Sequence, residues 1–111
     1  MNLEELRAKL LTLHELHLAP EKLIDEYRSF DAPQRLLANH IISEWLLSND
    51  ESMRSDAILL IERFRIKSAL ANLEKVRDRF PLGMSPSDLH EREKVEQVIK
   101  GLWADIGNVV S

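Results

Sequence analysis

The sequence contains no cysteine, and it has only three glycines and four prolines among its 111 residues. Without cysteine the chain has no disulfide, no thiolate nucleophile and no cysteine-ligated metal site. No apolar run approaches the roughly 20 residues that a membrane-spanning helix needs. The N-terminus, MNLEELRAKL, carries acids where a signal peptide has a basic start. These features predict a cytoplasmic protein with no membrane partner.

The chain also lacks an excess of basic charge and the short motifs of common enzymes. Its 15 Lys and Arg residues stand against 19 Asp and Glu residues, which gives a formal net charge of −4. A nucleic-acid ligand needs a basic stripe, so we expect no nucleic-acid partner, whereas an acidic surface favours encounter with basic proteins. Glycine-rich phosphate loops and Gly-x-Ser-x-Gly turns are absent. We therefore predict no enzymatic activity, no catalytic residue and no cofactor.

The chain does contain a series of amphipathic helical patterns, and no segment alternates cleanly with period two. Apolar residues make up 44% of the chain and charged residues 31%, an ordinary balance for one folded domain of this length. Short connections force consecutive helices to lie side by side. The sequence thus predicts one all-α domain, 1–111, of about six antiparallel helices stacked in layers.

Prolines, caps and apolar spacing place these helices along the chain. The first two form an N-terminal pair within 1–31, with Asn2 as an N-cap and Pro20 as a first helical residue. Ser85 is expected to cap the last helix, and Gly107 is expected to end it. The predicted ranges of the other helices are 33–47, 50–64, 67–80 and 86–108.

The stretch LLSNDESMRSDAILLIERFRIKSALANL, residues 46–73, has a distinctive spacing. An acidic turn at Asp50 is followed by Arg54 and, three residues later, by the small Ala57; an Ala-Leu-x-x-Leu element then begins the next helix. Over about 34–80 this pattern resembles a HEAT repeat, a unit of two antiparallel helices that stacks on further units. The resemblance implies a HEAT-like core over 33–80, within a short HEAT-like α-solenoid or a layered helical bundle. Ala57 would permit close helix approach, and the head of Arg54 would reach the acidic turn.

Several residues allow both a structural and a functional interpretation. His14 and His17 lie one helical turn apart, a spacing that can hold zinc, but no third ligand is evident. We expect surface histidines near a helix C-terminus and no metal site. Ile58 and Leu59 point away from the core face of their helix, so they lie either between helical layers, the preferred interpretation, or on a binding surface. The bulky aromatic residues expected to anchor the core are Tyr27, Trp45 and Trp103.

HEAT-like stacks are recognition scaffolds, so the resemblance implies a protein-binding module. Small, acidic, cysteine-free domains of this kind are similar to bacterial immunity proteins of contact-dependent growth inhibition and other polymorphic toxin systems. The leading hypothesis is an immunity protein that blocks a cognate toxin domain, such as a nuclease with a basic surface. The alternative is a small helical adaptor that binds another cellular protein or itself. The expected partner-binding residues, on solvated faces of the later helices, are Glu51, Ser55, Glu62, Glu91 and Glu93.

Overall fold

The computed structural model describes residues 2–15, 20–79 and 85–110, and all regular structure within these ranges is helical. The elements in chain order are α1 (Leu3–Glu15), α2 (Glu21–Ser29), α3 (Ala32–Trp45), α4 (Glu51–Phe64), the 3-10 turn η1 (Lys67–Ala69), α5 (Leu70–Asp78) and α6 (Pro86–Val110). The prediction of an all-α fold with about six helices is confirmed. In the described part of the chain, no helix combines the length and the apolar character that a membrane crossing requires.

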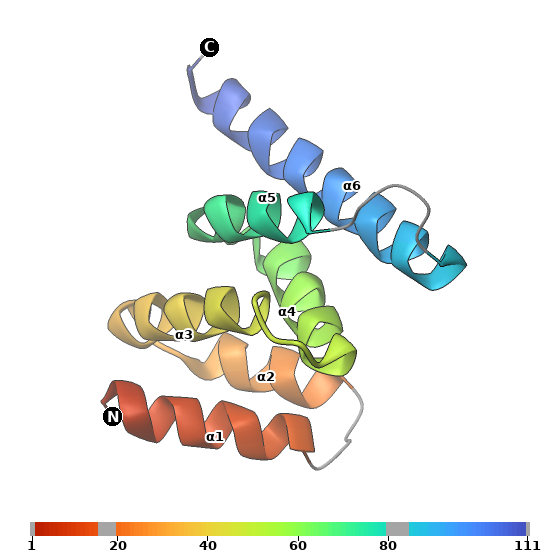
Figure 1. Cartoon of the computed structure of the whole chain (residues 1–111). Coiled ribbons are helices and arrows are strands. Elements are labelled where there is room, and N and C mark those ends of the chain that lie inside the picture. The colour runs from red at the N-terminus through yellow and green to blue at the C-terminus, as the bar shows by residue number, and fades with distance from the viewer. Residues whose placement is uncertain (1, 16–19, 80–84, 111) are drawn as a thin grey trace.

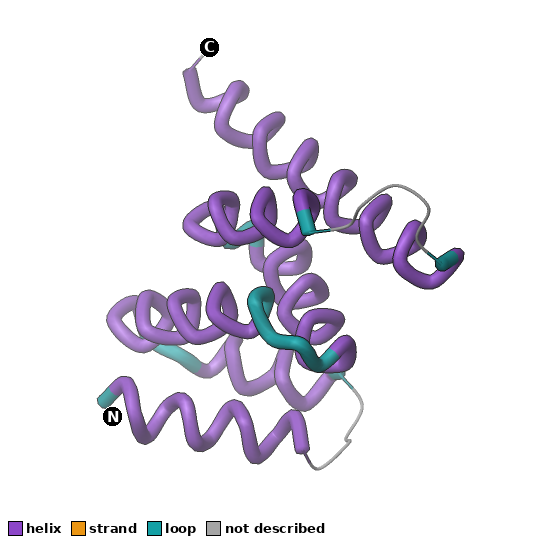
Figure 2. The backbone as a smooth tube through the Cα atoms, in the orientation of Figure 1, coloured by secondary structure: helices purple, strands orange, loops and turns teal. Residues whose placement is uncertain are grey.

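The helices alternate in direction along the chain (Figure 1). α1, α3 and α5 run the same way and lie one above another, whereas α2, α4 and α6 run back beside them. α4 and α6 cross their neighbours obliquely, and the described loops between the helices are short (Figure 2). The molecule measures 42 × 39 × 21 Å. Its smallest dimension is about two helix diameters of roughly 10 Å, as expected for two layers of helices.

Local signals determine where the two central helices begin. Asp31 accepts the N–H of Gln34 at 2.9 Å and donates its own N–H to the Gln34 side chain at 3.0 Å, which forms a capping box before α3. The carboxylate of Asp50 accepts the N–H of Ser52 at 2.9 Å and caps α4. Arg65, with a φ of 54°, ends α4 in the left-handed conformation.

The Asp50 cap leads to a prediction for acid pH. Hydrogen bonds from the side chain and backbone of Ser52 lower the pKa of the Asp50 carboxyl from its ordinary 3.8. Because the folded pKa is depressed, this stabilisation is complete above the unfolded value and is lost as the pH falls through the folded value. Asn also caps helices well but has no carboxyl to titrate. The free energy of unfolding of Asp50→Asn should therefore depend less on pH than that of the parent below about pH 4. Urea titrations between pH 2 and 6 measure this, and parallel pH profiles would contradict it.

Two predicted helix boundaries require correction. The segment predicted as one helix over 67–80 begins with the tighter turn η1, and α5 covers only Leu70–Asp78. The last helix continues to Val110 instead of ending at Gly107, because a glycine without a following helix breaker only weakens a helix. Phe80, residues 81–84 and His17 lie outside the described residues.

Gly101 lies within α6 at the point where a side chain from the end of α4 crosses it. A Cβ at this position would come within 2.8 Å of Nη1 of Arg65. The Nε of Arg65 is 3.5 Å from Oδ2 of Asp105, one turn further along α6. The glycine that weakens the helix locally thus leaves room for this contact between α4 and α6.

The apolar core lies between the layers and includes residues from all six helices. Tyr27 and Phe64 stack with ring centroids 4.2 Å apart and join α2 to α4. Trp45 is buried, as predicted. The largest fully buried side chains are Leu6, Leu10, Ile41, Ile42, Leu46, Leu60, Ile61, Leu73, Val76, Val95, Val98 and Leu102.

Trp103 was predicted in the core, but its exposed fraction is 53%, so this prediction is wrong. The adjacent Leu102 is fully buried, so α6 is covered at this level on one side only. The helices that pack on α6 cover the side that carries Leu102 and leave much of the Trp103 side chain in solvent.

Candidate functional site

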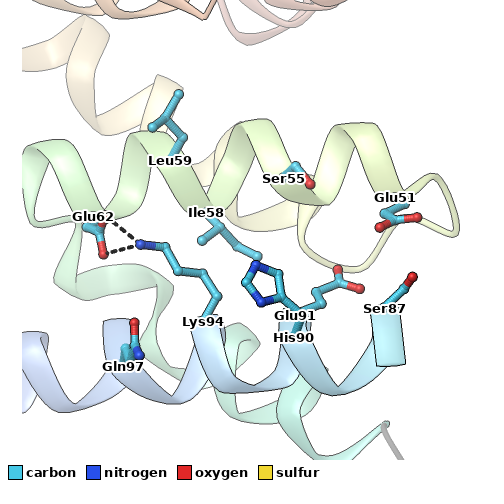
Figure 3. A pocket seen from close by; sticks show the side chains of 10 residues that line it. All are labelled: Glu51, Ser55, Ile58, Leu59, Glu62, Ser87, His90, Glu91, Lys94 and Gln97. Atoms are coloured by element: carbon cyan, nitrogen blue, oxygen red, sulfur yellow. Dashed lines mark hydrogen bonds and ion pairs between the residues drawn. The ribbon is translucent and has the colours of Figure 1, made fainter. Parts of the chain in front are cut away.

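α4 and α6 enclose a groove of about 510 Å³ that opens to the surface (Figure 3). We call it the α4/α6 groove. The α4 wall consists of Glu51, Ser55, Ile58, Leu59 and Glu62, and the α6 wall consists of Ser87, His90, Glu91, Lys94 and Gln97. Within each wall most residues are separated by steps of three or four, and such steps return to the same face of a helix. The groove is therefore formed by one face of each helix.

The floor of the groove is apolar. The exposed fraction of Ile58 is 4%, and its side chain points toward His90 and Lys94 in Figure 3. Ile58 thus lies between α4 and α6, as the layered interpretation predicted. Leu59 is half-buried and points away from Ile58 in this view. It contributes to the groove wall while remaining partly accessible.

A buried ion pair joins the two walls at one end. The Nε of Arg54 donates to Oε1 of Glu91 at 2.7 Å, and its Nη2 donates to Oε2 at 3.2 Å. The side chains are only 14% and 9% exposed. The Arg54 Nη1 also donates to the carbonyl oxygen of Ser48 at 3.0 Å, so the guanidinium reaches the turn before α4, as expected. The hydrogen bonds to Glu91 raise the pKa of Arg54 above its ordinary value, so its guanidinium stays charged despite its burial.

This geometry corrects the prediction for Glu91. Its carboxylate was expected on a solvated face, available to a partner, whereas both of its oxygens accept hydrogen bonds from Arg54. The reason is that one guanidinium can satisfy a carboxylate bidentately, and α6 packs so that the two meet. Glu91 therefore holds α6 against α4.

A second ion pair spans the groove near its other end. The Nζ of Lys94 lies 2.9 Å from both carboxylate oxygens of Glu62, as the dashed lines in Figure 3 show. Their side chains are 42% and 41% exposed. Exposed pairs of this kind contribute little net stability, because water competes for both charges. This bridge can open at low cost, unlike the Arg54–Glu91 pair.

The remaining predicted residues differ in their accessibility and position. Glu51 and Ser55 are exposed on the groove wall. Within the described part of the chain, Glu51 makes no hydrogen bond or ion pair through its carboxylate. Glu93 is exposed, but it does not line the groove. Four of the five predicted residues thus meet in one groove. The prediction missed the four other residues of the α6 wall, although their helical spacing relative to Glu91 was a usable signal.

A separate cluster joins α1 to α4. The Nδ1 of His14 is 2.6 Å from Oδ2 of Asp56, and its ring centroid is 5.7 Å from that of Trp45. The His14 side chain is only 8% exposed, so the prediction of a surface histidine is wrong for this residue. Asp56 and Trp45 are distant in sequence and meet His14 only when α1 packs against the later helices.

This cluster has the connectivity of a Ser-His-Asp relay, since the Nε2 of His14 lies 3.4 Å from Oγ of Ser52. However, the Ser52 hydroxyl donates to Oδ1 of Asp50 at 2.7 Å, so its proton is directed away from the imidazole. The Ser52 N–H donates to the same carboxylate. An acyl-transfer site needs free hydrogen-bond donors beside its nucleophile, and here a carboxylate takes that place. We therefore interpret the cluster as a structural junction.

Two further features concern possible sites outside the groove. A smaller hollow of about 280 Å³ is lined by Leu36, Asn39, His40, Ser43, Ser68 and Asn72. Within residues 2–15, 20–79 and 85–110, no three His, Asp or Glu side chains are grouped so that they could hold a metal ion. His17, the second histidine of the pair considered from the sequence, lies outside these ranges. The expectation of no metal site stays a prediction.

Comparisons of the chain with protein-family models, with curated proteins and with solved structures each give no match. The geometry of the α4/α6 groove is therefore the basis for a functional proposal.

Proposed function

We propose that the protein is a protein-binding module that holds a partner in the α4/α6 groove, and that it serves as an immunity protein against a toxin with a basic surface. One observation carries the proposal: Glu51, Ser55 and Glu62 on α4 face a row of α6 residues across a groove whose floor is apolar. An apolar centre with a polar, accessible rim is the usual anatomy of a protein interface.

The charge of the groove supports a basic partner. Three carboxylates and one ammonium group line it, and Arg54 already neutralises the carboxylate of Glu91. Among the described residues Glu51 makes no ion pair and feels only the charge of Arg54, which is already bound to Glu91. Glu62 is paired with the accessible Lys94. A basic toxin surface would supply the missing cations, and the net charge of −4 would favour its approach. An immunity protein bound in this way would cover the surface that a nuclease toxin uses for substrate phosphates.

The proposal of a HEAT-like stack is supported by the order of the helices. α1, α3 and α5 lie in one row, and each is followed by a returning helix. In stacked helix pairs the returning helices present an extended surface to partners. The α4/α6 groove lies between two such helices.

The alternative, a helical adaptor that binds a cellular protein or itself, is favoured by one observation. Trp103 of α6 is 53% exposed, and exposed tryptophans are common anchors of interfaces. If the adaptor hypothesis holds, Trp103→Ser should abolish self-association or partner binding. The groove variants described next should then have no effect.

The groove proposal predicts a specific kinetic defect. The double variant Glu51→Lys/Glu62→Lys should slow association with a cognate toxin domain, to be sought among the products of the neighbouring genes, by about tenfold at low salt, because it reverses the steering charge. The dependence of the rate on ionic strength should also flatten. Stopped-flow association at several salt concentrations measures both effects.

A matched control carries the same charge change outside the groove. Glu15 and Glu93 are exposed and do not line the groove, so Glu15→Lys/Glu93→Lys changes the net charge equally. This control should associate nearly as fast as the parent. Equal slowing in both double variants would mean that only net charge matters, and an unchanged rate in the groove variant would refute the proposed site.

A further inference from the structure

We infer that the occupant of the α4/α6 groove is a basic amphipathic α-helix of the partner, with two cations about three turns apart on either side of an apolar residue. This inference rests on the proposed function and specifies the class of partner. The inference rests on three features of the groove. These are the spacing of the lining residues along each helix, the distribution of charge along α4 and the accessibility of the ion pair between Glu62 and Lys94.

The shape of the groove fits a helix. On α4 the residues Glu51, Ser55, Ile58 and Glu62 are separated by steps of four, three and four. The opposite wall on α6 consists of Ser87, His90, Glu91, Lys94 and Gln97, in steps of three apart from the adjacent pair His90 and Glu91. Rows of side chains with these steps form the ridges between which a third helix packs. A helix laid in the groove would complete a three-helix arrangement.

The backbone chemistry also favours a helix over an extended segment. All regular structure in the described residues is helical, so the groove offers no strand edge to pair with an extended peptide. An extended occupant would leave backbone donors and acceptors desolvated without partners, which is costly. A helix satisfies its own backbone groups and presents only side chains to the groove.

The charges along α4 specify the side chains of the occupant. Glu51 and Glu62 are eleven positions apart, which corresponds to about 16 Å, or three turns. An apolar side chain between them would contact the accessible part of Leu59, above the nearly covered Ile58. Cations at either end would pair with Glu51 and Glu62, and an arginine could bind the latter bidentately in place of Lys94. The half-exposed Glu62–Lys94 bridge would be exchanged at little cost.

The experiment uses the full chain and three synthetic 16-residue peptides of identical charge. The first has leucines on one helical face and arginines eleven positions apart. The second contains the same residues in an order without an amphipathic face, and the third has a central proline that prevents a continuous helix. Fluorescence anisotropy gives the Kd at two salt concentrations, and circular dichroism of the mixtures reports helix formation.

The first peptide should bind at least tenfold more tightly than the other two and should gain helicity on binding. Glu51→Lys/Glu62→Lys should weaken its binding tenfold or more, whereas Glu15→Lys/Glu93→Lys should change it less than threefold. Ser55→Tyr, which fills the groove without changing charge, should also weaken binding. Circular dichroism of each variant alone verifies that it is folded.

These measurements separate three possible failures: that of the helical occupant, that of the groove as the binding site and that of the proposed function. Equal affinity for all three peptides, or no affinity for any of them while the toxin domain still binds through the groove, would overturn the helical occupant and leave the proposed function intact. Helical binding that no groove variant weakens would overturn the site itself. A toxin domain whose association is insensitive to the groove variants would refute the proposed function, even if the first peptide binds there.

Discussion

Arg54→Ala is expected to lower the free energy of unfolding by about 3 kcal/mol, because it leaves the buried carboxylate of Glu91 without its cation. The side chains of the pair are 14% and 9% exposed, and two hydrogen bonds join them. The substitution also removes the bond from Arg54 to the carbonyl oxygen of Ser48, which lies in the turn between α3 and α4. The sequence alone suggested a smaller effect, limited to lost packing and contact with the turn. Urea denaturation at neutral pH measures the difference.

The Glu62–Lys94 pair provides a matched control, because it also joins α4 to α6 but is about 40% exposed. Lys94→Ala should therefore cost less than about 1 kcal/mol. The double variant Arg54→Met/Glu91→Met should recover much of the loss of Arg54→Ala, since apolar residues of similar size carry no unpaired charge. Similar losses for Arg54→Ala and Lys94→Ala would show that burial does not distinguish the two pairs.

The Arg54–Glu91 pair also bears on the groove. It fixes α6 against the first half of α4, between Glu51 and Ile58, and therefore influences the separation of the groove walls. A folded variant that lacks this pair should bind the helical peptide less tightly than the parent, even though Arg54 does not line the groove. The Arg54→Met/Glu91→Met protein permits this measurement without a large loss of stability.

Ala57→Leu is expected to lower the free energy of unfolding by about 1–3 kcal/mol through overpacking. Ala57 is fully buried in the core on α4, so three additional carbon atoms have no space unless neighbouring helices move. Ala71→Leu, on the exposed surface of α5, introduces the same side chain in a helix and should change stability by no more than about 0.5 kcal/mol. Thermal and urea melts compare the two variants. An Ala57→Leu protein as stable as the parent would show that the helices do not approach closely there, and the HEAT-like interpretation would then fail.

The sequence by itself determined the helical elements and most of their boundaries. Asp50 caps α4, and Asp31 with Gln34 caps α3, through hydrogen bonds that span only two or three residues. Apolar spacing also predicted the burial of Tyr27 and Trp45, because an apolar stripe along a helix packs against the core. These properties depend on neighbours within one or two turns, which a single sequence displays directly.

Only the tertiary structure decided which charged side chains form ion pairs and which aromatic side chains are exposed. Glu91 is paired with Arg54 across 37 positions, and His14 meets Asp56 across 42. Trp103 is exposed although the adjacent Leu102 is fully buried, because the helices packed on α6 cover only the side that carries Leu102. None of these outcomes follows from helical periodicity, since each depends on the position at which one helix crosses another. That position is set by the packing of side chains from distant segments, and it also brought Glu51, Ser55 and Glu62 opposite α6 to form the groove.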